Sequence, residues 1–205
     1  FVSDSVDAAA VSVSPVFRGP GGGTVPVQVR RLDGDTAEVA FIVDWLPADG
    51  QVEYTLESGE AEYPGLVEYE SNRLVFDGGE VAAAVPLPGE ESYEEPRPIS
   101  EAAPPLLSVR RSGGAWIGQG GMTGDLGVKS VQIRLVAEGP VYAEFETHYE
   151  LTSGYYTARV RVVRGQEVVL FSDEVDTGDE GKGRAHFRFD VTEQLAPERV
   201  MARGR

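Results

Sequence analysis

Side chains alternate between apolar and polar along residues 141–162, and this period of two is the feature that most restricts the fold. The first half puts one set of side chains on each face of an extended chain, Ala143, Phe145, Thr147, Tyr149 and Leu151 on one and Tyr142, Glu144, Glu146, His148 and Glu150 on the other. A period of two is the signature of a β-strand whose two faces meet different surroundings. With the turn residues 152–154 between its halves, the segment predicts an antiparallel hairpin.

Matching the apolar faces sets the register of this hairpin. Pairing Phe145 with Val160 brings Glu146 beside Arg159, whereas a slip of one residue would set Glu146 beside Val160. The same register predicts three further pairs, which are Tyr149 with Tyr156, Ala143 with Val162 and Glu144 with Arg161. We expect the Glu–Arg pairs to be exposed, and so to contribute less than ~1 kcal/mol each.

Shorter apolar runs recur along the chain, at residues 25–29, 37–43, 52–56, 74–76, 81–85, 106–109, 115–117 and 168–171. The run 168–171 is wholly apolar and is typical of a central strand. The glycine-rich residues 118–127 are predicted to form a loop, and residues 191–200 are the one place for a short helical turn. The pattern predicts an all-β chain of antiparallel β-sandwich or barrel modules with almost no helix.

A change of composition divides the chain. Residues 89–105 are rich in proline and glutamate, which remove backbone donors and repel one another, so they predict a linker or a long loop. Residues 1–88 are then an N-terminal β-barrel-like or sandwich module. Residues 106–205 are a second β-sandwich module, complete or incomplete.

Charge excludes some classes of partner. Lys and Arg total 18 against 34 Asp and Glu, a net charge of −16. Nucleic-acid binding normally needs a basic surface, and anionic membranes repel such a chain, so neither nucleic acid nor a membrane surface is an expected partner. No apolar run approaches the ~20 residues of a membrane helix. The absence of cysteine excludes disulfides, thiolate zinc sites and cysteine nucleophiles.

Three aromatic residues are candidates for carbohydrate binding. Trp116 lies beside Gly114 and Gly118, and an exposed indole ring can stack on the C–H face of a sugar. The competing interpretation is a core tryptophan at one end of the fold, since large aromatic side chains are mostly buried. Tyr142 and Tyr155 are candidates of the same kind.

Metal and catalytic sites have less support. His148 lies between Glu146 and Glu150, a pattern open to a proton shuttle or a metal ligand, but a flat strand face rarely encloses an ion. Five acids that share one glycine-containing segment could hold calcium, and these are Asp173, Glu174, Asp176, Asp179 and Glu180. Their spacing does not match a helix–loop–helix calcium loop, which favours a solvated hairpin tip. No catalytic motif is present, so no catalytic residue is predicted, and calcium is the one cofactor left open.

Two groups of segments carry a family resemblance. The first comprises residues 25–29 (Val-Pro-Val-Gln-Val), 40–48 and 52–56, and the second comprises residues 138–141 (Glu-Gly-Pro-Val), 149–151, 156–160 and 165–166. In this order they resemble the N-terminal β modules of large bacterial polysaccharide-processing proteins, the exo-rhamnogalacturonan-lyase-like group. The resemblance implies a small β-barrel-like module before a β-sandwich of the galactose-mutarotase-like type. In that group the chemistry is attributed to a helical toroid, which this chain lacks.

The leading hypothesis is therefore a non-catalytic β module of an extracellular bacterial protein that acts on polysaccharide. Its partners would be a polysaccharide or a catalytic domain of the same protein, at the cell surface or outside the cell. The alternative is a structural subunit of an extracellular fibre or surface layer, which self-associates by adding the strand of Val11, Val13 and Phe17 to a neighbour's sheet. A complete enzyme, such as a polysaccharide lyase or glycoside hydrolase, is the third hypothesis.

Overall fold

The computed structural model describes residues 2–7, 15–31, 35–43, 48, 50–59, 63–178 and 183–191. Its elements are β1 (Val2–Asp7), β2 (Pro15–Arg18), β3 (Thr24–Val25), β4 (Val27–Arg31), β5 (Thr36–Phe41), β6 (Thr55–Ser58), β7 (Val67–Tyr69), β8 (Leu74–Asp77), β9 (Val81–Val85), β10 (Gly89–Pro98), the short 3-10 helix η2 (Ile99–Glu101), β11 (Ser108–Arg111), β12 (Gln119–Gly124), β13 (Gly127–Ala137), β14 (Tyr142–Leu151), β15 (Tyr155–Val163), β16 (Val169–Asp176) and β17 (Ala185–Asp190). The prediction of an antiparallel, nearly all-β chain is confirmed. Within the described ranges, no helix is long and apolar enough to cross a membrane.

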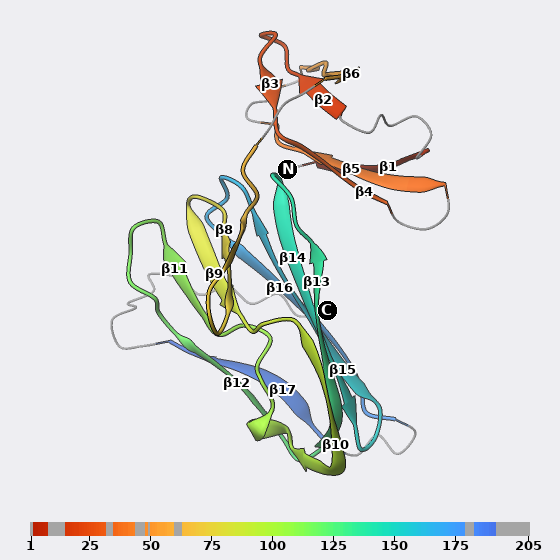
Figure 1. Cartoon of the computed structure of the whole chain (residues 1–205), viewed down its shortest axis with the longest axis vertical. Coiled ribbons are helices and arrows are strands. Elements are labelled where there is room, and N and C mark those ends of the chain that lie inside the picture. The colour runs from red at the N-terminus through yellow and green to blue at the C-terminus, as the bar shows by residue number, and fades with distance from the viewer. Residues whose placement is uncertain are drawn as a thin grey trace.

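Strands β1 to β6 form an N-terminal unit of two small sheets, in the orders β1-β5-β4 and β3-β2-β6 (Figure 1). Aromatic rings join the two sheets, since Phe17 stacks on Phe41 at 4.8 Å and Phe41 lies 5.2 Å from Tyr54. Of the three residues expected on a donor strand, Phe17 lies in β2 and is paired within this chain with β3 and β6. Val11 and Val13 lie outside the described residues.

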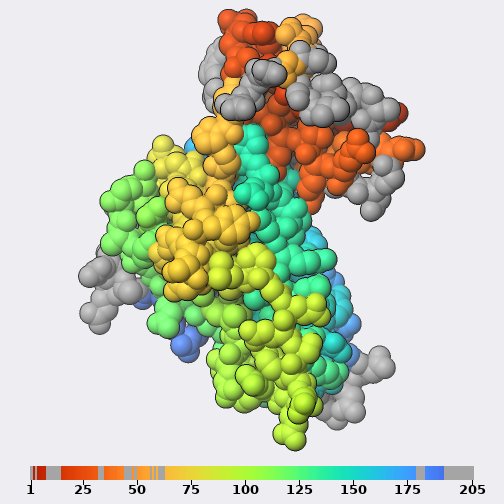
Figure 2. All heavy atoms as spheres, in the orientation of Figure 1, coloured from red at the N-terminus to blue at the C-terminus, as the bar shows by residue number. Residues whose placement is uncertain are grey.

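Strands β7 to β17 form a β-sandwich, on one end of which the N-terminal unit sits (Figure 2). One layer is the sheet β10-β13-β14-β15-β16, and the other comprises the sheets β11-β9-β8-β7 and β12-β17. Side chains from both layers meet in the core, as where the Phe76 and Phe145 rings approach edge to face at 6.1 Å. Phe187 of β17 likewise stacks on Phe171 of β16 at 4.6 Å. In the part of the chain that the structure describes, no sheet closes into a barrel.

The hairpin predicted from the alternation is strands β14 and β15. Phe145 lies opposite Val160 and Glu146 opposite Arg159, in the register that matches the apolar faces. The other three predicted pairs, Tyr149 with Tyr156, Ala143 with Val162 and Glu144 with Arg161, are also present. Phe145 and Val160 are fully buried, so the register prediction and the inner face are confirmed.

The proline- and glutamate-rich segment expected to be a linker or a long loop contains strand β10. It pairs with β13, with an irregularity between Ser92 and Arg97, around Pro96. An edge strand is bound through its backbone on one side, and so tolerates acidic side chains and proline without an apolar alternation. Strands β7 to β9, which the sequence assigns to residues 1–88, share a core with β14 and β15.

Two other local predictions, for residues 118–127 and for residues 168–171, are wrong. The glycine-rich run expected to be a loop contains strand β12, where a Cβ atom on Gly120 would lie 1.7 Å from the Leu106 carbonyl oxygen. Glycine here permits a close backbone approach. The apolar run at 168–171 belongs to the edge strand β16, in which Phe171 faces the core while Leu170 stays 46% exposed.

Candidate functional site

The outer face of the β14–β15 hairpin carries a row of charged side chains. Glu144 and Glu146 are each only 5% exposed, so the expectation of exposed Glu–Arg pairs is wrong. Glu146 is covered from both sides, since Arg159 of β15 and Arg134 of β13 both bind it. These long arginine side chains lie over the carboxylates and exclude water from them, while their own guanidinium groups remain in contact with solvent.

The contacts in this row are short. Arg159 donates from Nε to Glu146 Oε2 at 2.8 Å, and its Nη2 lies 2.7 Å from the same oxygen. Arg161 donates from Nε to Glu144 Oε2 at 2.5 Å. Burial by itself would raise the pKa of Glu146, but the hydrogen bonds from Arg134 and Arg159 outweigh it, so the pKa lies below its usual value.

A buried side chain fastens the N-terminal unit to the start of β14. Gln28 of β4 is 6% exposed, and its Oε1 accepts hydrogen bonds from the backbone N–H groups of Val141 and Tyr142, at 3.2 and 2.9 Å. A Cβ atom on Gly139 would lie 2.4 Å from the Gln28 amide, so the turn before β14 needs glycine to admit this side chain. Gln28 therefore fixes how β4 lies against the sandwich.

A second contact sits beside the first. The buried hydroxyl of Tyr142 donates to Glu38 of β5 at 2.8 Å, and Glu38 also binds Arg30 Nη2 at 2.9 Å. Burial would raise the pKa of Glu38, but the hydrogen bond from Tyr142 and the charge of Arg30 lower it further than burial raises it. Burial and the neighbouring Glu38 raise the pKa of Tyr142. Arg30 is thus held at the edge of the outer face.

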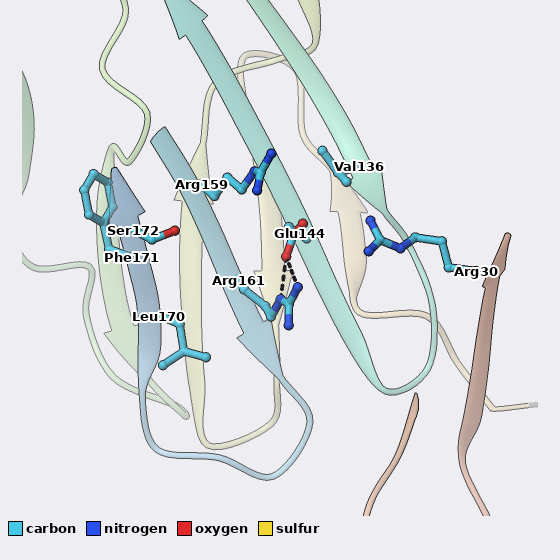
Figure 3. A pocket seen from close by; sticks show the side chains of 8 residues that line it. All are labelled: Arg30, Val136, Glu144, Arg159, Arg161, Leu170, Phe171 and Ser172. Carbon is cyan, nitrogen blue, oxygen red and sulfur yellow. Dashed lines mark hydrogen bonds and ion pairs between the residues drawn. The ribbon is translucent and has the colours of Figure 1, made fainter. Parts of the chain in front are cut away.

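Between Arg30 and the hairpin lies a hollow of about 560 Å³, which we call the arginine hollow (Figure 3). It is lined by Arg30, Val136, Glu144, Arg159, Arg161, Leu170, Phe171 and Ser172. Figure 3 shows Arg30 approaching Glu144 from the side opposite Arg161. Three guanidinium groups and one carboxylate therefore line a single open space.

The lining of the arginine hollow is positive in a strongly acidic chain. That lining holds three guanidinium groups and one carboxylate, while the adjoining charged residues are Arg134 and the acids Glu38, Glu146, Asp173 and Glu174. Guanidinium groups are planar, carry five N–H donors and match the geometry of oxyanions. The arrangement can thus bind a negatively charged or strongly hydrogen-bonding ligand. No model of a known protein family matches this chain, and no curated protein matches it either.

The three predicted carbohydrate-binding rings lie apart from one another. Trp116 is half-buried on the connection between β11 and β12, with the guanidinium carbons of Arg73 and Arg110 at 4.6 and 4.7 Å from its ring centroid. Tyr142 is fully buried beneath Arg161. Tyr155, at the other end of the hairpin, is half-buried and donates to Glu174 at 2.7 Å. Sugar binding by these rings stays a prediction.

His148 and the acidic segment form no metal centre among the described residues. His148 Nδ1 lies 2.8 Å from Thr157 Oγ1, while its neighbour Glu146 is bound by arginine. Asp173, Glu174 and Asp176 lie in strand β16, whereas Asp179 and Glu180 fall outside the described residues.

Sequence reasoning missed Arg30, Arg134 and Ser172 as members of one site. Arg134 reaches Glu146 because it lies directly opposite this residue in the pairing of β13 with β14. The alternation within the β14–β15 hairpin does not reveal which residue of a third strand lies opposite Glu146. Arg30 comes from a different sheet, and its position depends on the Gln28 contact, for which the sequence carries no signal.

Proposed function

We propose that this chain is a non-catalytic β module of an extracellular bacterial polysaccharide-processing protein, which holds a polysaccharide on the outer face of its five-stranded sheet. There it would orient the ligand for a catalytic domain of the same protein. The observation that carries the proposal is the arginine hollow, a concave space lined by polar groups from both β units.

The lining suits a sugar. Arg159, Arg161 and Ser172 can hydrogen-bond to hydroxyl or acidic groups, and the half-exposed Leu170 and the partly buried Val136 offer apolar contact to C–H faces. A volume of about 560 Å³ falls in the ordinary range for small-ligand sites. Because Glu144 and Glu146 hold the guanidinium groups in place, a ligand would meet donors that are already oriented.

The joint between the two β units supports an orienting role. Gln28 belongs to the first group of segments that carry the family resemblance, and Val141 belongs to the second. The two residues meet directly through a buried hydrogen bond. A module whose two parts are fastened in this way presents its ligand at a fixed angle to whatever follows in the protein.

Affinity gel electrophoresis against a panel of neutral and acidic polysaccharides tests the proposal. We expect at least one polysaccharide to retard the protein. Ser172→Trp should abolish the retardation, because a large ring at this exposed position fills the arginine hollow. Val168→Trp is the matched control, since Val168 is exposed on the same edge but does not line the hollow. Failure of every polysaccharide to retard the protein would refute the proposal.

A further inference from the structure

We propose that the arginine hollow is an oxyanion site, which binds the carboxylate, sulfate or phosphate group of an anionic ligand through Arg30 and Arg159. This inference rests on the proposed function, because it names the chemical class of the ligand for the same hollow. It adds that the recognised group carries negative charge, which the proposed function does not require.

The donors for such a group are present. Arg159 uses Nε and Nη2 on Glu146, and Arg30 uses Nε and Nη2 on Glu38. A guanidinium group has five N–H donors, so the two N–H groups on Nη1 of each arginine are left to donate. Hydrogen bonds from a guanidinium to an oxyanion are among the stronger ones in proteins.

The charge balance favours an anion despite the net charge of −16. Charges beyond about 8–10 Å are largely screened at physiological ionic strength, so the distant acids contribute little at the hollow. The two acids that adjoin Arg159, Asp173 and Glu174, accept hydrogen bonds from the hydroxyls of Tyr156 and Tyr155. Within the cluster, Arg134 and Arg159 share the single carboxylate of Glu146. One guanidinium charge is therefore left without a carboxylate of its own, and both side chains are 57% exposed. An oxyanion would supply the missing counter-charge.

Both arginines are also held in advance of binding. Glu146 and Glu38 are largely buried and anchor the two guanidinium groups from below, and Tyr142 anchors Glu38 in turn. Binding would then order few side chains, which lowers its entropic cost. Figure 3 shows the guanidinium groups of Arg30, Arg159 and Arg161 on the same side of the sheet.

Isothermal titration calorimetry of the full chain tests the inference. The probes are sodium glucuronate, sodium sulfate and sodium phosphate, each at constant ionic strength maintained with sodium chloride, and glucose is the neutral control. We expect at least one of the three anions to bind and glucose not to bind. Glucuronate alone would identify a carboxylate ligand, and sulfate or phosphate alone would identify the corresponding ester.

Two pairs of variants locate the site. Arg159→Gln should weaken anion binding by about tenfold or more, whereas Arg111→Gln, an exposed arginine paired with Glu167 elsewhere, should not. Leu170→Glu places a carboxylate at the rim from a half-exposed position, so it should repel the anion without disturbing the core. Val168→Glu adds the same charge two residues away and should have a much smaller effect.

The outcomes separate this inference from the proposed function. Loss of anion binding in Arg159→Gln and Leu170→Glu, with both controls intact, supports the oxyanion site. Equal binding by all four variants, or no binding of any anion, overturns it. If a neutral polysaccharide retards the protein and no anion binds, the proposed function stands and the oxyanion site fails. If an anion binds at the hollow and no polysaccharide retards the protein, the oxyanion site stands and the proposed function fails.

Discussion

Arg159 donates to Glu146 across the β14–β15 hairpin at 2.8 Å, and the carboxylate that it binds is almost completely buried on what is nominally the outer face of the sheet. A second guanidinium, that of Arg134, closes over the same carboxylate from the opposite strand. The pair is therefore part of the packing of the sheet as well as of its surface. Replacing the buried glutamate and replacing one of its exposed arginine partners should therefore lower the free energy of unfolding by different amounts.

Glu146→Ala should lower the free energy of unfolding by about 1.5–3 kcal/mol, because it removes hydrogen bonds to two charged groups at once. Glu150→Ala is the control, since Glu150 lies on the same strand face but is mostly exposed. Its Oε1 lies 3.7 Å from Lys129 Nζ, which is longer than the contacts of Glu146 with its arginines. Its loss should cost less than ~1 kcal/mol. Urea unfolding of both variants measures the difference, and equal costs would show that burial of Glu146 has no energetic weight.

Phe145→Ala should lower the free energy of unfolding by about 3–5 kcal/mol, through lost burial and the cavity that remains. Val175→Ala, a half-exposed position on β16, should change it by about 0.5 kcal/mol or less. A double-mutant cycle with Phe76→Ala should give a coupling of about 0.5–1.5 kcal/mol from the edge-to-face contact. Strict additivity would mean that the two sheets do not pack through these rings.

Stability should fall in acid through Glu146 and Glu38. The pKa of each lies below its usual value of 4.5 in the folded chain, so the unfolded chain binds more protons as the pH falls. The stabilisation is therefore complete above about pH 4.5 and is lost as the pH falls through the lower, folded pKa. Urea midpoints between about pH 6 and pH 3 measure this loss. Glu146→Gln should show a shallower pH dependence, and an unchanged slope would exclude Glu146 as a contributor.

Gln28→Ala should loosen the N-terminal unit from the sandwich. The change leaves the buried N–H groups of Val141 and Tyr142 without their acceptor, which costs about 1–3 kcal/mol for each. Hydrogen exchange should accelerate at these two amides more than at the β14 amides further along the strand. Gln119→Ala, at an exposed position of β12, is the control and should leave exchange unchanged. Unaltered protection at Val141 and Tyr142 would argue against the joint.

Part of the candidate site could be read from the sequence. The opposition of Glu146 to Arg159 and of Glu144 to Arg161 follows from matching two apolar faces, and the structure has both pairs. Their burial does not follow, because it depends on Arg134 from a third strand. The contribution of Arg30 could not be predicted from the sequence either, because it requires Gln28 to hold β4 against the sandwich.

The sequence by itself determined the strand class, the β14–β15 register and the position of Phe145 in the core, because these depend on side chains within one hairpin. Tertiary structure decided the rest. Strand β10 forms by backbone pairing with β13, and its acidic and proline-rich sequence does not predict this pairing. The arginine hollow exists because two sheets that are distant in the chain meet at one edge, and such a meeting depends on long-range contacts that no local periodicity encodes.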